Sequence, residues 1–182
     1  MRTNIPEKLL KIVDDIHERG DVNLTRLTVL KKWFGRPQRL SKFALWVASR
    51  AVSRKGKTNT ATAELFRDAR ALLADLNSPA PKADREVVRR LHARLRDFQN
   101  EYDRQRWGPV RIIHNWNLML IEQALEIWLR YSDRPEVGYK LAADYCQNYD
   151  PRYGNGLNGP SRTKIEEIVR FMFTVEALED GD

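Results

Sequence analysis

The sequence predicts an all-α protein, a single-domain bundle of about eight helices around a central apolar helix at about residues 110–131. Apolar residues recur every three or four positions along most of the chain, which is the period of an α-helix with one buried face. The alternation of apolar and polar residues that marks β-strands is nearly absent. The chain has 182 residues, of which 42% are apolar, so it is long enough to bury a core.

Proline and glycine residues separate the first four predicted helices. Pro6 suits the first turn of a helix that ends before Gly20. Gly35 and Pro37 mark the turn after the second helix, and the segment Asn-Ser-Pro-Ala-Pro at 77–81 ends the fourth. These four helices are expected at about residues 6–19, 23–34, 38–55 and 59–76.

The second half of the chain contains four further predicted helices. The one at about 83–105 carries a narrow apolar stripe on an otherwise charged helix. The one at about 110–131 is apolar on most sides, which is typical of a helix at the centre of a bundle. The last two are expected at about 135–149 and 161–178, joined by a polar loop. The stripe of the fifth helix consists of Val88, Leu91, Leu95, Phe98 and Tyr102.

The polar loop contains a glycine-rich run, Gly154 to Gly159, that matches the GxGxxG pattern of dinucleotide sites. Such a site needs a preceding strand, and residues 145–150 are predicted to be the end of a helix instead. Pro160 stands where a Walker loop has its phosphate-binding lysine. The sequence therefore predicts no nucleotide site and no cofactor.

We expect one domain over residues 1–182, with a candidate sub-boundary near 53–60, where the charge balance changes. The single cysteine, Cys146, excludes an internal disulfide framework and a multi-cysteine zinc site. No window is apolar enough to span a bilayer, and the first ten residues lack the features of a secretory signal. We therefore expect a cytoplasmic protein without a membrane partner.

The positive charge is concentrated in one part of the chain. The net charge is +7, and residues 22–63 carry ten Lys and Arg with no Asp or Glu. This asymmetry favours a polyanionic partner such as nucleic acid. The alternative is a solvated basic face that pairs with carboxylates of the same fold, because residues 112–182 have a net charge of −5.

The predicted helix at 38–55 has a basic face and a separate apolar face. Lys and Arg at helical spacing can follow a phosphate backbone, a tryptophan can stack on a base, and the Ser53 hydroxyl can donate to phosphate. The apolar face consists of Leu40, Phe43, Ala44, Val47, Ala48 and Ala51. The predicted nucleic-acid-binding residues are Arg36, Arg39, Lys42, Trp46, Arg50, Arg54, Lys55 and Lys57.

The first functional hypothesis is a protein that binds DNA or RNA through this face, with no catalytic residue assigned. A second is a helical adaptor whose basic face binds an acidic protein surface or another copy of the chain. A third is a small helical ribonuclease, in which Arg85 would bind the scissile phosphate and His92 would act as general base two turns away. None of the three histidines has the HxxxH or HxxE spacing of metal ligands on its own helix, so the sequence predicts no metal site.

Overall fold

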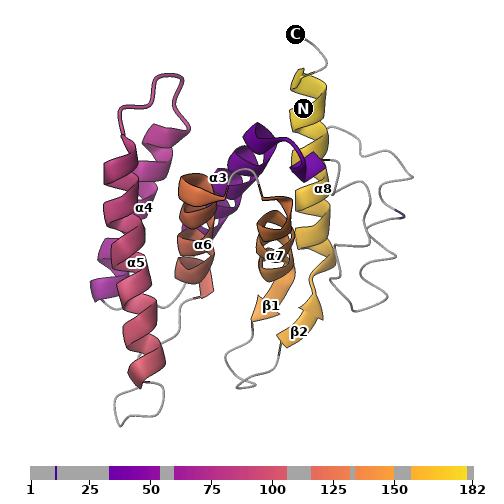
Figure 1. Cartoon of the computed structure of the whole chain (residues 1–182). Helices are drawn as coiled ribbons and strands as arrows, with labels where there is room; N and C mark the ends of the chain where they lie inside the picture. The colour runs from indigo at the N-terminus through magenta and orange to yellow at the C-terminus, as the bar shows by residue number, and fades with distance from the viewer. Residues whose placement is uncertain are drawn as a thin grey trace. The chain divides into compact units, whose positions relative to one another are not determined.

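The computed structural model describes residues 11, 33–53, 60–105, 116–131, 134–149 and 157–179. This part of the chain is predominantly helical, so the prediction of an all-α protein is confirmed with one small exception, a pair of short strands (Figure 1). The helices are α3 (Pro37–Ser53), α4 (Thr60–Leu76), α5 (Arg85–Gln105), α6 (Trp116–Arg130), α7 (Pro135–Cys146) and α8 (Arg162–Glu179). The strands are β1 (Gln147–Tyr149) and β2 (Leu157–Pro160).

The two helices predicted at about 6–19 and 23–34 lie almost entirely outside the described residues. The total of about eight helices therefore stays a prediction. Each of the other six predicted helices overlaps a helix of the described residues. Where the expected and the observed bound both lie in the described residues, they differ by at most three residues.

The chain divides into two compact units. Unit 1 comprises residues 1–39 and 133–182, and unit 2 comprises residues 40–132. The divisions fall within the first turn of α3 and after α6, whereas the sequence analysis placed its candidate sub-boundary near 53–60. A single domain over the whole chain stays a prediction.

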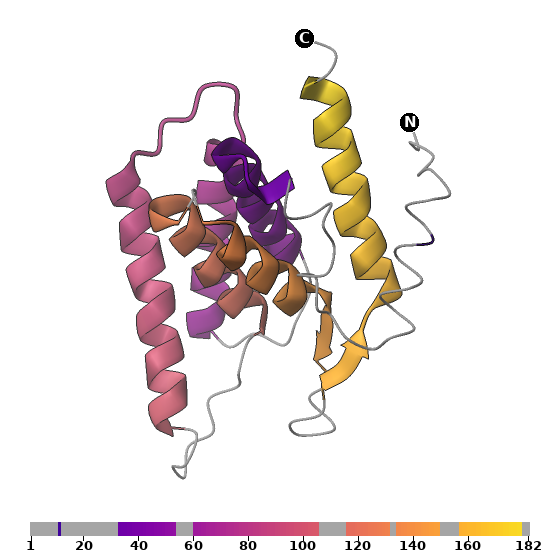
Figure 2. The same cartoon turned by 45° about the vertical axis from the view of Figure 1, so that its right-hand side comes forward.

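In unit 2, α4, α5 and α6 pack on one another (Figures 1 and 2). The connection from α4 to α5 is fixed by two aspartates. Asp75 Oδ2 accepts hydrogen bonds from the N–H groups of Lys82 at 3.0 Å and Ala83 at 2.6 Å. Asp84 Oδ1 accepts from the N–H groups of Glu86 and Val87, each at 2.9 Å, and so caps the start of α5.

The apolar faces of α3 and α5 are buried as predicted. All six residues of the α3 apolar face have 0% exposure. On α5, Val88 and Leu95 are at 0% and Leu91 is at 6%, while Phe98 is half-buried and the side chain of Tyr102 is outside the described residues. The spacing of three and four residues was therefore sufficient to identify the buried side of each helix.

Helix α6 is less uniformly buried than its apolar sequence suggests. Seven of its residues are buried, and Trp116, Met119 and Trp128 are only half-buried. Its predicted start at about residue 110 lies outside the described residues. The position of this helix at the centre of the molecule stays a prediction.

Unit 1 contains α7, α8 and the two strands, which join the end of one helix to the start of the other. The strands are antiparallel, with Asn148 opposite Asn158 and Tyr149 opposite Leu157, and the register shifts next to Gln147. The prediction that α7 continues to residue 149 and that 150–160 is entirely loop is therefore wrong. The strands have three and four residues, which is too short for an alternating pattern to be detected in the sequence.

Unit 1 also contains a cluster of aromatic rings. Trp33 meets Phe34 and Phe171 edge-on, with ring centroids 5.4 and 5.9 Å apart. Phe34 meets Tyr139 in the same way at 5.5 Å. Such perpendicular pairs are favourable because the positive edge of one ring faces the negative face of another.

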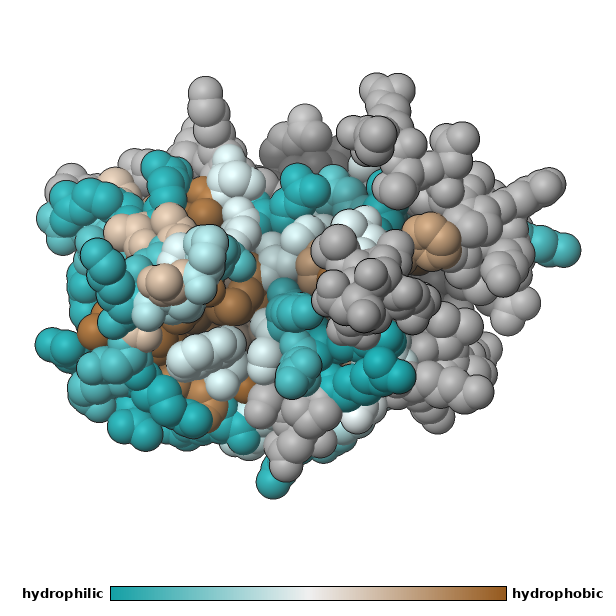
Figure 3. Space-filling model, turned by 90° about the horizontal axis from the view of Figure 1, so that it is seen from above, coloured by the Kyte–Doolittle hydropathy of each residue, from teal (hydrophilic) through white to brown (hydrophobic). Residues whose placement is uncertain are grey.

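No helix in the described residues is both long enough and apolar enough to cross a membrane. Seen from above, hydrophilic side chains cover much of the described surface, and apolar side chains appear in small groups between them (Figure 3).

Candidate functional site

The basic face of α3 retains three of its predicted residues in the described structure, Lys42, Trp46 and Arg50. They are spaced four residues apart and so follow one side of the helix. Lys42 and Arg50 are exposed, and Trp46 is half-buried. Helix α3 contains no Asp or Glu, so neither cation has a carboxylate on its own helix.

The ring of Trp46 is held between the core and the surface. It stacks on Phe43, with ring centroids 5.8 Å apart and an angle of 26° between the planes. The guanidinium of Arg50 lies over the same ring, 5.6 Å from its centroid. This arrangement orders an aromatic ring and a cation beside each other at the surface.

Arg39 does not belong to the exposed part of this face. Its exposed fraction is 8%, and its guanidinium lies over the ring of Trp33, 5.5 Å from the centroid. The helical spacing correctly placed Arg39 on the side of Lys42, but Trp33 covers this position. Arg39 therefore contributes to packing in unit 1, and we do not count it among the surface cations.

The remaining predicted residues lie outside the exposed line on α3 or outside the described residues. Arg36 is exposed in the turn before α3, and Arg54, Lys55 and Lys57 lie outside the described residues. The hydroxyl of Ser53 donates to the carbonyl of Arg50 at 2.8 Å. The expected role of Ser53 as a phosphate donor stays a prediction, because an exposed hydroxyl can rotate toward another acceptor.

The net positive charge belongs entirely to unit 2. Residues 40–132 carry 17 Lys and Arg against 10 Asp and Glu, a net charge of +7. The other residues carry 15 of each and are neutral overall. Some cations of α5 form ion pairs with carboxylates of the same unit at its surface. For example, Arg94 Nη1 lies 2.7 Å from Asp68 Oδ2.

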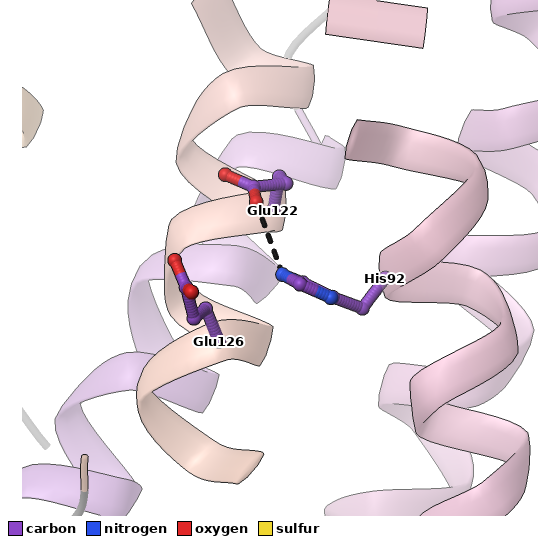
Figure 4. Close-up of side chains that lie close together, drawn as sticks. All are labelled: His92, Glu122 and Glu126. Atoms are coloured by element: carbon purple, nitrogen blue, oxygen red, sulfur yellow. Dashed lines mark ion pairs between the residues drawn. The ribbon is translucent and has the colours of Figure 1, made fainter. Parts of the chain in front are cut away.

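A second group of polar residues lies between α5 and α6. His92 on α5 is 4% exposed, and its ring points toward Glu122 and Glu126 of α6 (Figure 4). Nε2 of His92 lies 3.0 Å from Oε1 of Glu122. One potential ligand atom from each of the three residues lies within 4.8 Å of the others.

The register of the two helices explains why these residues meet. Arg85 donates a hydrogen bond to the carbonyl of Leu129, and seven residues further along α5, His92 reaches Glu122, which is seven residues before Leu129. The two helices therefore run in opposite directions where they meet. Arg85 and His92 do share one face of α5, as their spacing predicted, and that face is turned toward α6.

This placement bears on the ribonuclease hypothesis. The proposed general base, His92, is buried against Glu122, and Arg85 is bonded to a backbone carbonyl. The structure does not present the two side chains as an exposed pair for a phosphodiester. The ribonuclease hypothesis stays a prediction.

Glu122 and Glu126 were not predicted as potential ligands, because ligand spacing was considered only within the helix of each histidine. A signal was nevertheless present. Glu122 and Glu126 are four residues apart and interrupt an otherwise apolar stretch of α6. Carboxylates at this spacing lie on one face of a helix, and a carboxylate that packing removes partly from water needs a partner.

Comparison with known protein families, with curated proteins and with solved structures finds no match to this chain. The function must therefore be argued from the residues and their arrangement.

Proposed function

We propose that the protein binds nucleic acid through the exposed side of α3. The observation that carries this proposal is the line of Lys42, Trp46 and Arg50, which lies opposite a completely buried apolar face. The helix is therefore fixed by its core side, and its outer side offers two cations with a half-exposed aromatic ring between them. Cations bind phosphates and the ring is suited to stacking on a base.

The distribution of charge supports the same conclusion. The whole net charge of +7 lies in unit 2, which contains this line of residues. A long-range positive potential raises the rate at which a polyanion is captured. Recognition is expected to depend mainly on backbone contacts and stacking, because Lys and Arg can bind phosphates of any sequence and a ring can stack on any base.

Salt dependence tests this mode of binding on the full chain. If Lys42, Arg50 and the adjoining Arg54 each neutralise one phosphate, log affinity for duplex DNA should fall against log salt with a slope of about −3. Fluorescence anisotropy with labelled duplex DNA and single-stranded RNA, at several salt concentrations, measures this slope. Heparin serves as a polyanion without bases.

A double variant tests whether the exposed side of α3 is the binding surface. Lys42→Gln with Arg50→Gln should weaken binding to all sequences and flatten the slope by about 2. The matched control is Arg90→Gln with Arg96→Gln, which removes the same charge from two exposed positions of α5. If the control weakens binding as much as the α3 variant does, binding follows net charge, and the assignment to α3 is wrong.

The role of Trp46 can be separated from that of the cations. Trp46→Leu keeps apolar cover over Phe43 but removes the ring that can stack on a base. We expect a greater loss for single-stranded RNA than for duplex DNA, on the order of tenfold or more, because stacking contributes about 1–3 kcal/mol per base. An equal loss on both ligands would indicate a structural role for the ring.

The same measurements distinguish the other functional hypotheses. If the wild type binds no nucleic acid at low salt, the proposal is wrong, and an adaptor with an acidic protein partner becomes the better explanation. Light scattering then tests whether that partner is a second copy of the chain. Cleavage of the labelled RNA during the titration would instead support the ribonuclease hypothesis.

A further inference from the structure

We propose that His92, Glu122 and Glu126 form a binding site for a divalent first-row transition-metal ion, with Zn²⁺ as the representative ion. The proposal does not depend on nucleic-acid binding. The three side chains come from two helices that pack together, and each offers a ligand atom within 4.8 Å of the other two. Helices are rigid supports, so the site is built into the fold of unit 2.

The surroundings of the buried His92 Nε2 atom support a bound metal ion. Its Nε2 is fully buried and makes no hydrogen bond of normal geometry within the described residues, although it lies 3.0 Å from Oε1 of Glu122. A lone pair on Nε2 and a carboxylate oxygen at this distance repel each other unless a hydrogen or a metal ion lies between them. A hydrogen carried on Nε2 by the neutral ring does not meet Glu122 with normal hydrogen-bond geometry, whereas a metal ion can be bound by both atoms.

The negative charge of the two glutamates also supports a bound cation. Glu122 and Glu126 bring two negative charges to a site where the side chain of Glu122 is only 14% exposed. Within the described residues, neither glutamate forms an ion pair with Lys or Arg, and Arg85, on the same face of α5, is bonded to the Leu129 carbonyl. A divalent ion bound by the three side chains balances both carboxylates.

The ligand set determines the class of ion. Imidazole nitrogen together with carboxylate oxygen suits Zn²⁺ and its neighbours in the first transition row, whereas Mg²⁺ prefers oxygen ligands alone. Ligands about 2.1 Å from a tetrahedral ion lie about 3.4 Å apart, so small rotations of the glutamate side chains would close the present spacing. Three protein ligands leave one position open, which is the arrangement of catalytic rather than structural zinc sites.

Isothermal titration calorimetry of the full chain with Zn²⁺, and separately with Mg²⁺, tests the site. We expect one Zn²⁺ per chain and much weaker binding of Mg²⁺. Glu126→Gln and His92→Asn should each weaken Zn²⁺ binding by about 100-fold or more, because even residues that only orient a metal ligand are worth about 10–100-fold. The matched control, Glu86→Gln, removes an exposed carboxylate of α5 and should bind Zn²⁺ like the wild type.

Three results would overturn the proposal: no Zn²⁺ binding by the wild type, equal affinity for Mg²⁺, or unchanged Zn²⁺ affinity in Glu126→Gln. The first would mean that the three side chains form a purely structural cluster. Far-UV circular dichroism shows whether each variant is folded, and Glu126→Gln provides the test if His92→Asn is not. The Lys42→Gln, Arg50→Gln variant should bind Zn²⁺ normally, so failure of the nucleic-acid proposal leaves this result unaffected.

Discussion

Arg39 and Lys42 lie one turn apart on α3 and carry the same charge, but their surroundings differ. Arg39 is 8% exposed and covers the ring of Trp33, whereas Lys42 is exposed. Helical spacing in the sequence places both on one side of the helix and cannot distinguish them. The difference arises from an aromatic side chain six residues before Arg39, whose position depends on tertiary packing.

This pair gives a direct prediction. Arg39→Gln should lower the free energy of unfolding by about 1–2 kcal/mol, because a largely buried cation–π contact and the packing of the Arg39 stem are lost. Lys42→Gln should change it by less than about 0.5 kcal/mol, as is usual for exposed positions. Urea denaturation of the two variants measures both values. Equal stability of the variants would contradict the different environments of the two side chains.

Asp68 provides a prediction about pH. It accepts a hydrogen bond from Arg94 at 2.7 Å, and this bond, together with the nearby charge, holds the pKa of Asp68 below its usual value of 3.8. A carboxyl whose pKa is lower in the folded state stabilises the fold at neutral pH, and this stability is lost as pH falls through the folded-state pKa. Because the pair lies at the surface, its contribution is small.

Asp68→Asn should therefore lower stability by about 0.2–1 kcal/mol at pH 7. The difference from the wild type should disappear as the pH is lowered below 3.8. Thermal unfolding followed by circular dichroism across this range measures the effect. Asp97→Asn serves as the control, because Asp97 is exposed on α5 and makes no ion pair within the described residues. A constant difference at all pH values would exclude the ion pair as its cause.

At the scale of elements, α5 shows what periodicity can determine. The steps of three and four residues identified its buried side, where Val88 and Leu95 are completely covered. The same pattern could not identify His92 as a buried residue facing two carboxylates, because that contact depends on the register between α5 and α6. Registers between helices are set by packing, and the sequence of one helix does not contain them.

Leu95→Ala should lower the free energy of unfolding by about 2–5 kcal/mol, because it removes a buried side chain and leaves a cavity. Val87→Ala, on the same helix, should cost about 0.5 kcal/mol or less, since Val87 is 38% exposed. Chemical denaturation of both variants gives the comparison. Similar losses in the two variants would mean that the apolar stripe of α5 is not its main packing surface.

The burial of α6 and the presence of the two strands could not be predicted correctly from the sequence. The apolar sequence of α6 predicts burial on most sides, but Trp116 and Trp128 remain half-buried. Large rings often reach from a core to the surface, so their presence alone does not show complete burial. The strands were missed because each consists of so few residues that pairing, rather than any pattern, defines them.

For the whole molecule, the sequence predicts charge and fold class well and the grouping of helices poorly. The concentration of charge could be counted directly from the residues. The compact units could not be predicted in this way, because unit 1 combines residues 1–39 with residues 133–182. Contacts between distant segments leave no local pattern in the sequence. Unit 2, in contrast, is one continuous segment.

This continuity leads to a prediction for the segment 37–132, which begins at the first residue of α3 and includes all of unit 2. It contains α3, α4, α5 and α6, and all of the apolar face of α3. Its length is sufficient for an independent core. Produced alone, it should show a helical circular dichroism spectrum and a cooperative thermal transition. An unfolded segment would show that unit 2 needs the remaining residues in order to fold, and would support a single cooperative domain.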